Sequence, residues 1–542
     1  MDIQFNKNED EQKLAWGKVK KQLEKIYEGG GKKAQEKQNE KNKLVARERI
    51  AYLCDADKPF IEIGAFAGFG MYEEYGGCPA GGTVSGIGYV SGRQCVIVAN
   101  DQTVKAGAWF PITGKKNLRM QEIAMENHLP VIYIVDSAGV FLPLQDEIFP
   151  DKEHFGRIFR NNAKMSAMGI TQIAAVTGAC VAGGAYLPIM SDETLMVEGA
   201  GSIFLAGPYL VKAAIGEDAD AETLGGAATH NELSGIADYK FKTEEECLDR
   251  VKRIISKLGK QKTAGFDRIE AIAPSKKTGD IYGIIAADNS KPYNVLDIIN
   301  SIADGESFDE FKQDYGKTIV CGYARVDGWA VGIVANQRII VKSKKGEMQL
   351  GGVIYNDSAD KAARFIMNCN QKKIPLVFLQ DVTGFMVGSR SEHSGIIKDG
   401  AKLVNAVANS VVPKITIITG NSYGAGNYAM CGKAYDPRFI YAWPGAKIAV
   451  MGGEQAAKTM LQIQVAGMKA KGQQVTAEEE KIILDTITAK YLAQTKAQYA
   501  ASRLWVDAII DPADTRKVIS EGIAAADHNP DIAEFKVGVF QV

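Results

Sequence analysis

The alternation of apolar and polar residues along the chain predicts an α/β protein. From Phe60 to Val135, short apolar runs separated by glycines are typical of strands. After Val135, apolar runs alternate with longer amphipathic stretches, which is typical of α/β units. The first 50 residues predict helix instead, with one apolar stripe formed by Trp16, Val19, Leu23 and Ile26. We therefore expect a helical extension that precedes an α/β body.

Two further segments have helical patterns. Residues 32–43, "KKAQEKQNEKNK", have no apolar face and predict a solvated helix or a linker. Thr476 and Glu479 form a capping-box pattern, in which the hydroxyl and the carboxylate each satisfy a backbone N–H at a helix start. We expect a long helix to begin there.

Four segments of the chain occur twice, in the same order and 236 to 245 residues apart. The pairs are "VSGRQCVIVAN" (90–100) with "VDGWAVGIVAN" (326–336), "LPVIYIVDSAG" (129–139) with "IPLVFLQDVTG" (374–384), "GACVAGGAYLP" (178–188) with "GNSYGAGNYAM" (420–430), and "GSIFLAG" (201–207) with "AKIAVMG" (446–452). Four ordered matches at nearly one spacing predict a tandem duplication of a single α/β domain.

The length of 542 residues fits this duplication, because a single hydrophobic core stops growing at roughly 250–300 residues. We predict an N-terminal domain over residues 1–266 and a C-terminal domain over residues 293–542. The intervening residues 267–292, which include "APSKKTGD", are more polar and predict a linker.

Charge and cysteine content exclude several classes of protein. The net charge of -1 argues against a nucleic-acid-binding surface, which needs clustered Lys and Arg. The eight cysteines include no Cys-x-x-Cys pair, so we expect neither a zinc site nor any other bound metal. The start, "MDIQFNKNEDEQ", is unlike a secretory signal, and no apolar run is long enough for a membrane helix. We expect a cytoplasmic protein.

The two turns "GACVAGGAYLP" and "GNSYGAGNYAM" are the candidate functional elements. A strand that ends in a glycine-rich turn and opens a helix presents free backbone N–H groups, which can hold a phosphate or an oxyanion. Neither turn has the Gly-Lys-Ser/Thr of a P-loop or a convincing G-x-G-x-x-G, so nucleotide binding is weakly indicated. Tight strand–helix packing alone is the alternative, and the presence of two equivalent turns makes it less favoured.

Side chains that could do the chemistry are scarce. None of the five histidines (128, 154, 230, 393 and 528) lies in either turn, and no Ser-His-Asp or Cys-His order stands out. Cys180 could be a nucleophile, but its apolar neighbourhood favours packing. Asp136 and Asp381 occupy equivalent strand ends, where a helix cap is favoured over an acid–base role. We infer that a cofactor supplies the base while backbone amides hold the developing anion.

The sequence resembles the carboxyltransferase subunits of biotin-dependent acyl-CoA carboxylases over roughly residues 43–530. The resemblance rests on long segments such as "IVANDQTVKAGAWFPITGKKNLRMQEIAMENHLPVIYIVDSAGVFLPLQDEIFPD", "GACVAGGAYLPIMSDE", "IPLVFLQDVTGFMVG" and "AWPGAKIAVMGGEQAA". "FLPLQDEIFPDKEHFGRIF" and "YGAGNYAMCGKAYDPRF" favour the methylcrotonoyl-CoA branch. Propionyl- and acetyl-CoA carboxyltransferases usually have Gly-Gly-Ala-Tyr-Asp at the second turn, where this chain has Gly-Ala-Gly-Asn-Tyr at 424–428.

The resemblance implies two crotonase-like domains and a role for backbone amides at each turn. Gly183 and Gly184 would hold the thioester oxyanion of the acyl-CoA. Ala425 and Gly426 would hold the ureido oxygen of biotin, with Gly424 shaping the turn.

Three further residues are implied as weaker candidates. Phe385 would line the biotin side, and Gly139 and Lys115 would lie on the CoA side. For Lys115, a solvated lysine at a helix start is the favoured alternative.

The resemblance also implies partners. The chain lacks the Met-Lys-Met motif of a biotinylation site, to which "AGMKAK" around Lys469 is a poor match, and the duplicated domains leave no length for an ATP-binding module. Biotin would therefore come on a biotin carboxylase or biotin carboxyl carrier subunit, and the chain would form a homo-oligomer, usually a hexamer. Alternatives are the carboxyltransferase of another acyl-CoA carboxylase (propionyl-, acetyl- or geranyl-CoA), that of glutaconyl-CoA decarboxylase, and a non-catalytic scaffold of a biotin-protein complex.

Overall fold

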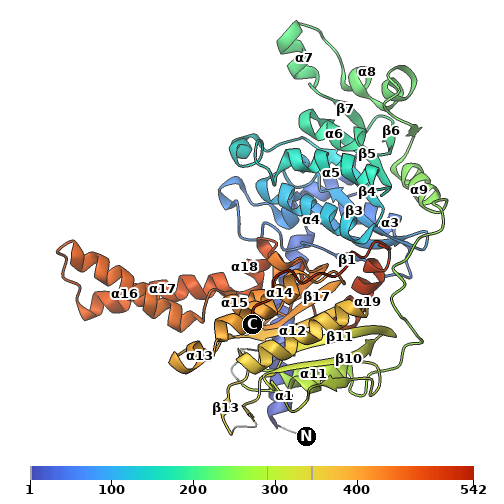
Figure 1. The fold of residues 1–542 in the computed structure, drawn as a ribbon. Helices are drawn as coiled ribbons and strands as arrows, with labels where there is room; N and C mark the ends of the chain where they lie inside the picture. Colours follow the sequence, from blue (N-terminus) through green and yellow to red (C-terminus); the bar gives the residue numbers. More distant parts are fainter. Residues whose placement is uncertain (1–2, 288, 290, 344–345) are drawn as a thin grey trace. The chain divides into compact units, whose positions relative to one another are not determined.

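The structure, a computed structural model, describes residues 3–287, 289, 291–343 and 346–542 (Figure 1). The chain forms two compact units. Unit 1 comprises the residues up to Lys20 together with Ala264–Ala500 and Trp505–Val542. Unit 2 comprises Lys21–Thr263 and the short segment Ala501–Leu504. The helical extension is confirmed as α1 (Ile3–Tyr27), with Val19 and Ile26 buried.

Unit 2 is built on one eight-stranded sheet in the order β1-β2-β3-β4-β5-β6-β8, with β7 paired to β5. The strands are β1 (Ile61–Glu62), β2 (Thr83–Val90), β3 (Arg93–Asn100), β4 (Val131–Ser137), β5 (Gln172–Val181), β6 (Glu193–Val197), β7 (Ser202–Phe204) and β8 (Tyr239–Phe241). The helices are α2 (Lys32–Asn39), α3 (Ala46–Leu53), α4 (Pro111–Asn127), α5 (Phe155–Ala167), α6 (Tyr186–Ile189), α7 (Pro208–Ile215), α8 (Ala221–Gly225) and α9 (Glu244–Ile255). Pairing is antiparallel from β1 to β3 and parallel beyond β3.

Unit 1 repeats this sheet in the order β20-β18-β17-β15-β11-β10-β9, with β19 paired to β17. The strands are β9 (Asp309–Phe311), β10 (Ile319–Val326), β11 (Trp329–Asn336), β15 (Leu376–Val382), β17 (Lys414–Tyr423), β18 (Phe439–Ala442), β19 (Lys447–Ala449) and β20 (Ala508–Ile509). Two small pairs lie outside it, β12 (Val341–Lys342) with β13 (Met348–Gln349) and β14 (Val353–Ile354) with β16 (Gly384–Phe385). Since each unit repeats the other's strand order and pairing, the predicted duplication is confirmed.

The helices of unit 1 follow the same pattern with one enlargement. They are α10 (Ile281–Ile284), α11 (Val295–Ile302), α12 (Asn356–Gln371), α13 (Ser389–His393), α14 (Ile396–Ala408), α15 (Ala425–Ala429), α16 (Gly453–Ala470), α17 (Ala477–Thr495), α18 (Ala497–Ser502) and α19 (Thr515–Ala526). Figure 1 shows α16 and α17 as a hairpin that projects from the rest of unit 1. The capping box is confirmed at the start of α17, where Thr476 N donates to Glu479 Oε2 at 2.8 Å.

The duplication extends to individual contacts. Helices α4 and α12 begin 245 residues apart, and each has a hydroxyl in its first turn that accepts a backbone N–H of the residue before the helix. Thr113 Oγ1 accepts from Phe110 N at 3.0 Å, and Ser358 Oγ accepts from Tyr355 N at 2.9 Å. Three residues beyond each hydroxyl lies a fully buried lysine, Lys116 or Lys361.

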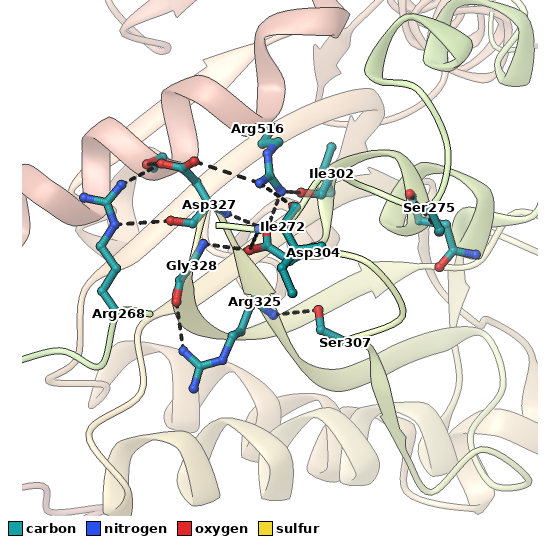
Figure 2. A network of polar contacts seen from close by, with 12 residues as sticks. Arg268, Ile272, Ser275, Ile302, Asp304, Ser307, Arg325, Asp327, Gly328 and Arg516 are labelled. Carbon is teal, nitrogen blue, oxygen red and sulfur yellow. Dashed lines mark hydrogen bonds and ion pairs between the residues drawn. The ribbon is translucent and has the colours of Figure 1, made fainter. Parts of the chain in front are cut away.

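The described residues of the segment 267–292, which the sequence predicts as a linker, lie within unit 1 and are partly packed there. Ile281 and Ile285 are fully buried. Figure 2 shows the polar network that holds the beginning of this segment. Asp304 accepts the backbone N–H groups of Ile272 (3.2 Å) and Gly328 (2.8 Å) and pairs with Arg516 at 2.5 Å. The polar composition of this segment therefore reflects anchoring as well as exposure.

The hydrophobic core of each unit lies between its sheet and the covering helices. In unit 2, Ile132 and Ile173 of the sheet are fully buried in one cluster with Leu248 of α9 and Leu53 of α3. In unit 1, β15 residues cluster with α12 and α14. No helix in the described part of the chain is long and apolar enough to cross a membrane.

Candidate active site: two glycine-rich turns

The two turns share one backbone feature. In each unit the first residue after the long strand (β5 or β17) has a positive φ, 56° at Ala182 and 54° at Gly424. This left-handed residue redirects the chain sharply from the strand into a short helix. Glycine adopts this conformation freely, whereas Ala182 holds it with a side chain, at a cost on the order of 1 kcal/mol.

Neither helix start is capped by a side chain. Neither N-cap residue, Val181 at the first turn or Gly424 at the second, has a side chain that accepts a backbone N–H of the helix. The first N–H groups of a helix have no partner inside it, so those of residues 183–184 and 425–426 are directed at whatever lies beyond the turn. Ala182 and Ala425 are exposed, which keeps both turns accessible. Each turn can therefore present adjacent backbone donors to an acceptor oxygen.

The first turn packs against Gly139 at the end of the β4 segment. A Cβ on Gly184 would lie 3.8 Å from Gly139 Cα, and a Cβ on Gly139 would lie 3.1 Å from the carbonyl oxygen of Val181. Trp109 N donates to Gly139 O at 2.8 Å, which fixes this approach. The structure thus places Gly139 against the turn that contains Gly183 and Gly184.

An aromatic row that the sequence analysis missed borders the same turn. A Cβ on Gly183 would stand 2.7 Å from the ring of Phe155. Ring centroids continue from Phe155 to Trp109 at 5.1 Å, to Phe159 at 5.1 Å and from Phe159 to Tyr186 at 5.9 Å. The aromatic residues of "HFGRIF" were the available signal, but their contact with the turn depends on the tertiary fold.

Asp136 and Asp381 do not cap helices, contrary to the sequence interpretation. Each lies at a register shift near the end of its strand and is buried in an ion pair. Asp136 pairs with Lys43 at 2.6 Å and with Arg49 at 3.3 Å. Their cationic partners come from distant parts of the chain, so no local pattern revealed them.

At the second aspartate, Arg338 lies 3.2 Å from Asp381, and the Tyr293 hydroxyl donates to it at 3.0 Å. Burial raises the pKa of Asp381 although Arg338 opposes the rise. The carboxylate of Asp381 is therefore held by an ion pair and a hydrogen bond inside the fold. A general-base role for Asp381 is therefore disfavoured.

These aspartates explain other repeated residues. Asn100 Oδ1 accepts from Asp136 N at 3.3 Å, and Asn336 Oδ1 accepts from Asp381 N at 3.1 Å. Each "VAN" segment thus ends in an asparagine whose side chain bonds to the backbone of the neighbouring strand, at the irregularity near that strand's end. Cys180 is fully buried and burial raises the pKa of its thiol, which confirms packing over nucleophilic chemistry.

The second turn borders a cavity of about 730 Å³ within unit 1. Its wall is largely apolar and aromatic and includes Gly424 and Ala425 of the turn together with Tyr428, Tyr491 and Trp505. Asn427, also in this wall, donates from Nδ2 to Ser422 Oγ at 2.7 Å. The cavity can enclose an apolar ring system whose acceptor oxygen faces the amides of the turn.

The sequence matches the carboxyl transferase domain family over residues 37–538. It is 49% identical over 514 residues to the methylcrotonoyl-CoA carboxylase beta chain of Dictyostelium discoideum, covering 94% of this chain and 84% of the relative. It is 48% identical to the biotin-dependent 3-methylcrotonyl-coenzyme A carboxylase beta1 subunit of Mycobacterium tuberculosis, covering 95% and 94%.

The chain belongs to the carboxyl transferase family. It is the carboxyltransferase subunit of a biotin-dependent acyl-CoA carboxylase. The beta subunit of P. aeruginosa geranyl-CoA carboxylase is a solved structure of similar fold, with a TM-score of 0.86 at 36% identity, covering 100% of this chain and 98% of that one. The predicted crotonase-like fold is confirmed.

Phe385 lies beside the second turn of this carboxyltransferase. It belongs to β16, which contacts α15, and its ring packs over Gly400, where a Cβ would stand 2.9 Å away. The ring is half-buried. A role of Phe385 on the biotin side stays a prediction.

Lys115 is an exposed residue near the start of α4. Its Nζ donates to the carbonyl oxygen of Arg503 at 2.7 Å, and partial burial with the nearby Arg503 charge lowers its pKa. The sequence analysis missed its neighbour Lys116, which is fully buried and donates to the carbonyl oxygens of Ala80 (2.9 Å) and Thr83 (2.6 Å). Burial lowers the pKa of Lys116 to about 7.

Proposed function

We propose that this subunit transfers a carboxyl group from carboxybiotin to 3-methylcrotonoyl-CoA. The observation that carries the proposal is the pair of duplicated turns, neither of which has a side-chain cap at the start of its helix. The relatives at 49% and 48% identity are named as methylcrotonoyl-CoA carboxylase subunits, which supports this acyl group.

The first turn is proposed to bind the acyl-CoA. Backbone N–H groups of Gly183 and Gly184 donate to the thioester oxygen, where negative charge develops when the substrate carbon loses its proton. Gly139 forms the adjoining wall. In other enzymes, removal of one such donor costs about 2.7–4 kcal/mol of transition-state stabilisation. Two donors at one oxygen are therefore a sufficient source of a large rate effect.

The second turn is proposed to bind biotin that is carried by a partner subunit. The apolar and aromatic wall of the 730 Å³ cavity fits a fused apolar ring, and the N–H groups of Ala425 and Gly426 fit its ureido oxygen. Gly424 gives the turn its left-handed residue, and Phe385 closes the adjoining side. When bound, carboxybiotin supplies both the carboxyl group and the base for the substrate proton.

This chain's own side chains orient the reactants and need not exchange a proton. Asp381 is committed to Arg338 and Tyr293, and Cys180 is a buried thiol of raised pKa. Lys115 is proposed at most to contact the CoA from the exposed start of α4. Among the described residues, no group of three or more His, Cys, Asp or Glu side chains could hold a metal ion.

Exposed apolar side chains support an oligomer. Unit 2 exposes Leu205, Tyr209 and Ile215 around α7, and unit 1 exposes Ile463 and Ile482 on the α16–α17 hairpin. Apolar surface of this kind, on elements that project from a unit, is typical of protein–protein interfaces. We propose a homo-oligomer, a hexamer by family resemblance, that works with a biotin carboxylase and biotin carrier subunit.

A geranyl-CoA substrate is the second candidate, because a subunit of that enzyme has a similar structure at 36% identity. Competition between 3-methylcrotonoyl-, geranyl-, propionyl- and acetyl-CoA for one carboxylated biotin protein separates these possibilities. The highest kcat/KM should belong to 3-methylcrotonoyl-CoA. A higher value for another acyl-CoA would replace the proposed substrate while leaving the family unchanged.

A further inference from the structure

The end of helix α17 returns to the second turn. Although the α16–α17 hairpin projects from unit 1 (Figure 1), the last residues of α17 line the cavity beside that turn. Tyr491, Gln494 and Thr495 belong to the same wall as Gly424 and Ala425. The hairpin therefore contributes directly to the proposed biotin site.

The hydroxyl of Tyr491 bonds to both polar backbone groups of one residue. It donates to the carbonyl oxygen of Met451 at 2.9 Å and accepts the N–H of Met451 at 3.3 Å. The next residue of α17, Leu492, packs against Gly453, where a Cβ would stand 2.7 Å from its side chain. Together these contacts fix α17 to the short connection between β19 and α16.

The connection between β19 and α16 packs against the second turn. Ala449, the last residue of β19, accepts the N–H of Gly424 at 3.0 Å. A Cβ on Gly424 would stand 2.9 Å from the carbonyl oxygen of Val450, so the backbone of Val450 lies directly against the turn. Met451 follows at once, and a shift of its backbone would move Val450 and the turn with it.

The first turn has a different support. The equivalent connection, residues 205–207 between β7 and α7, leads into a helix of only eight residues. In the described part of unit 2, no side-chain hydroxyl bonds to the backbone of Ala206, the counterpart of Met451. Tyr209 in that helix is 83% exposed. The tyrosine contact thus belongs to the second turn alone.

We propose that Tyr491 is a positioning residue for the biotin site: its hydroxyl holds Met451, and through Val450 it sets the position of the Gly424–Gly426 amides. Its ring also forms part of the wall against which the fused ring of biotin packs. This inference rests on the proposed function of the second turn. It predicts that the hydroxyl affects recognition of biotin and leaves recognition of the acyl-CoA unchanged.

Tyr491→Phe tests this, because it keeps the ring in the wall and removes only the hydroxyl. In carboxyl transfer by the full-length oligomer, the KM for the carboxylated biotin protein should rise about tenfold, because both hydrogen bonds to Met451 are lost, with the KM for acyl-CoA unchanged. Backbone hydrogen exchange over residues 449–453 should also become faster. The matched control is Thr486→Val, since the Thr486 hydroxyl bonds only to Ile482 O within α17, at 2.8 Å.

Three results would overturn the inference. In Tyr491→Phe, the KM for the biotin protein or the exchange rate over residues 449–453 could stay unchanged, or the two KM values could rise equally. In the control, Thr486→Val could produce the same changes as Tyr491→Phe. If the wild-type chain transfers no carboxyl group, the proposed function fails. The exchange measurement then still decides whether Tyr491 holds Met451.

Discussion

Asp381 lies directly against Gly420, so closely that any side chain at Gly420 would collide with its carboxylate. Asn421 N, the next backbone donor, bonds to Asp381 Oδ1 at 2.8 Å. Unit 2 repeats the arrangement with Asp136 against Gly178. In each unit, the first glycine of the glycine-rich segment therefore makes room for a buried, ion-paired aspartate.

Gly420→Ala should destabilise unit 1 by about 1–3 kcal/mol, because the methyl group must displace Asp381 from Arg338 and Tyr293. Chemical denaturation of the purified chain measures this. Gly467→Ala on α16 is the control, since a Cβ there meets nothing within 4 Å, and it should be neutral or stabilising. Equal stability of the Gly420 variant and the wild type would show that the carboxylate is not fixed as described.

Gly184→Val should lower kcat by about 100-fold or more while the oligomer persists, because the side chain enters the space in front of the backbone donors. The fold should tolerate it, since the nearest atom to a Cβ is Gly139 Cα at 3.8 Å. Steady-state transfer and size-exclusion chromatography measure the two properties. Retained activity would mean that the acyl-CoA oxyanion binds elsewhere.

Gly183→Ala provides the contrast. Its Cβ would press on the Phe155 ring at 2.7 Å, so this variant should lose stability as well as activity. If the two substitutions were equally destabilising, the packing described around the first turn would be wrong.

Lys116 should make stability depend on alkaline pH. Burial lowers its pKa from 10.5 to about 7 in the folded chain, so between these values the unfolded chain holds a proton that the folded chain has released. Stability should therefore rise as the pH increases from 7 towards 10.5 and gain nothing from this group below pH 7.

Lys116→Met should remove that dependence, whereas Lys481→Met, at an exposed site on α17, should leave it intact. Urea denaturation at pH 7, 8.5 and 10 measures the slope. A slope that persists in Lys116→Met would show that another group carries it.

The sequence predicted the duplication, the first helix and the α17 capping box, because each follows from local periodicity or a short pattern. It also singled out the two turns, since strand, glycine and helix signals adjoin there. The resemblance added site roles for Gly183, Gly184, Ala425 and Gly426, which stay proposals, as the cytoplasmic location stays a prediction.

What the sequence could not supply depends on contacts between distant residues. The local sequence favours a helix cap at Asp136, whereas its actual partners, Lys43 and Arg49, lie some ninety residues earlier in the chain. The polar segment 267–292 has the composition of a linker, and its anchor, Asp304, lies later in the chain, in the loop between α11 and β9. Tyr491 gave no signal, since its contact with Met451 spans the whole hairpin.

The most direct test of the account is a single-turnover transfer from a carboxylated biotin carrier protein to 3-methylcrotonoyl-CoA, catalysed by this chain and followed by mass spectrometry of the CoA product. The account predicts a product that has gained one carboxyl group, formed with the wild-type chain and lost with Gly184→Val. No carboxylated product from 3-methylcrotonoyl-, geranyl-, propionyl-, acetyl- or glutaconyl-CoA would contradict it and favour a non-catalytic scaffold.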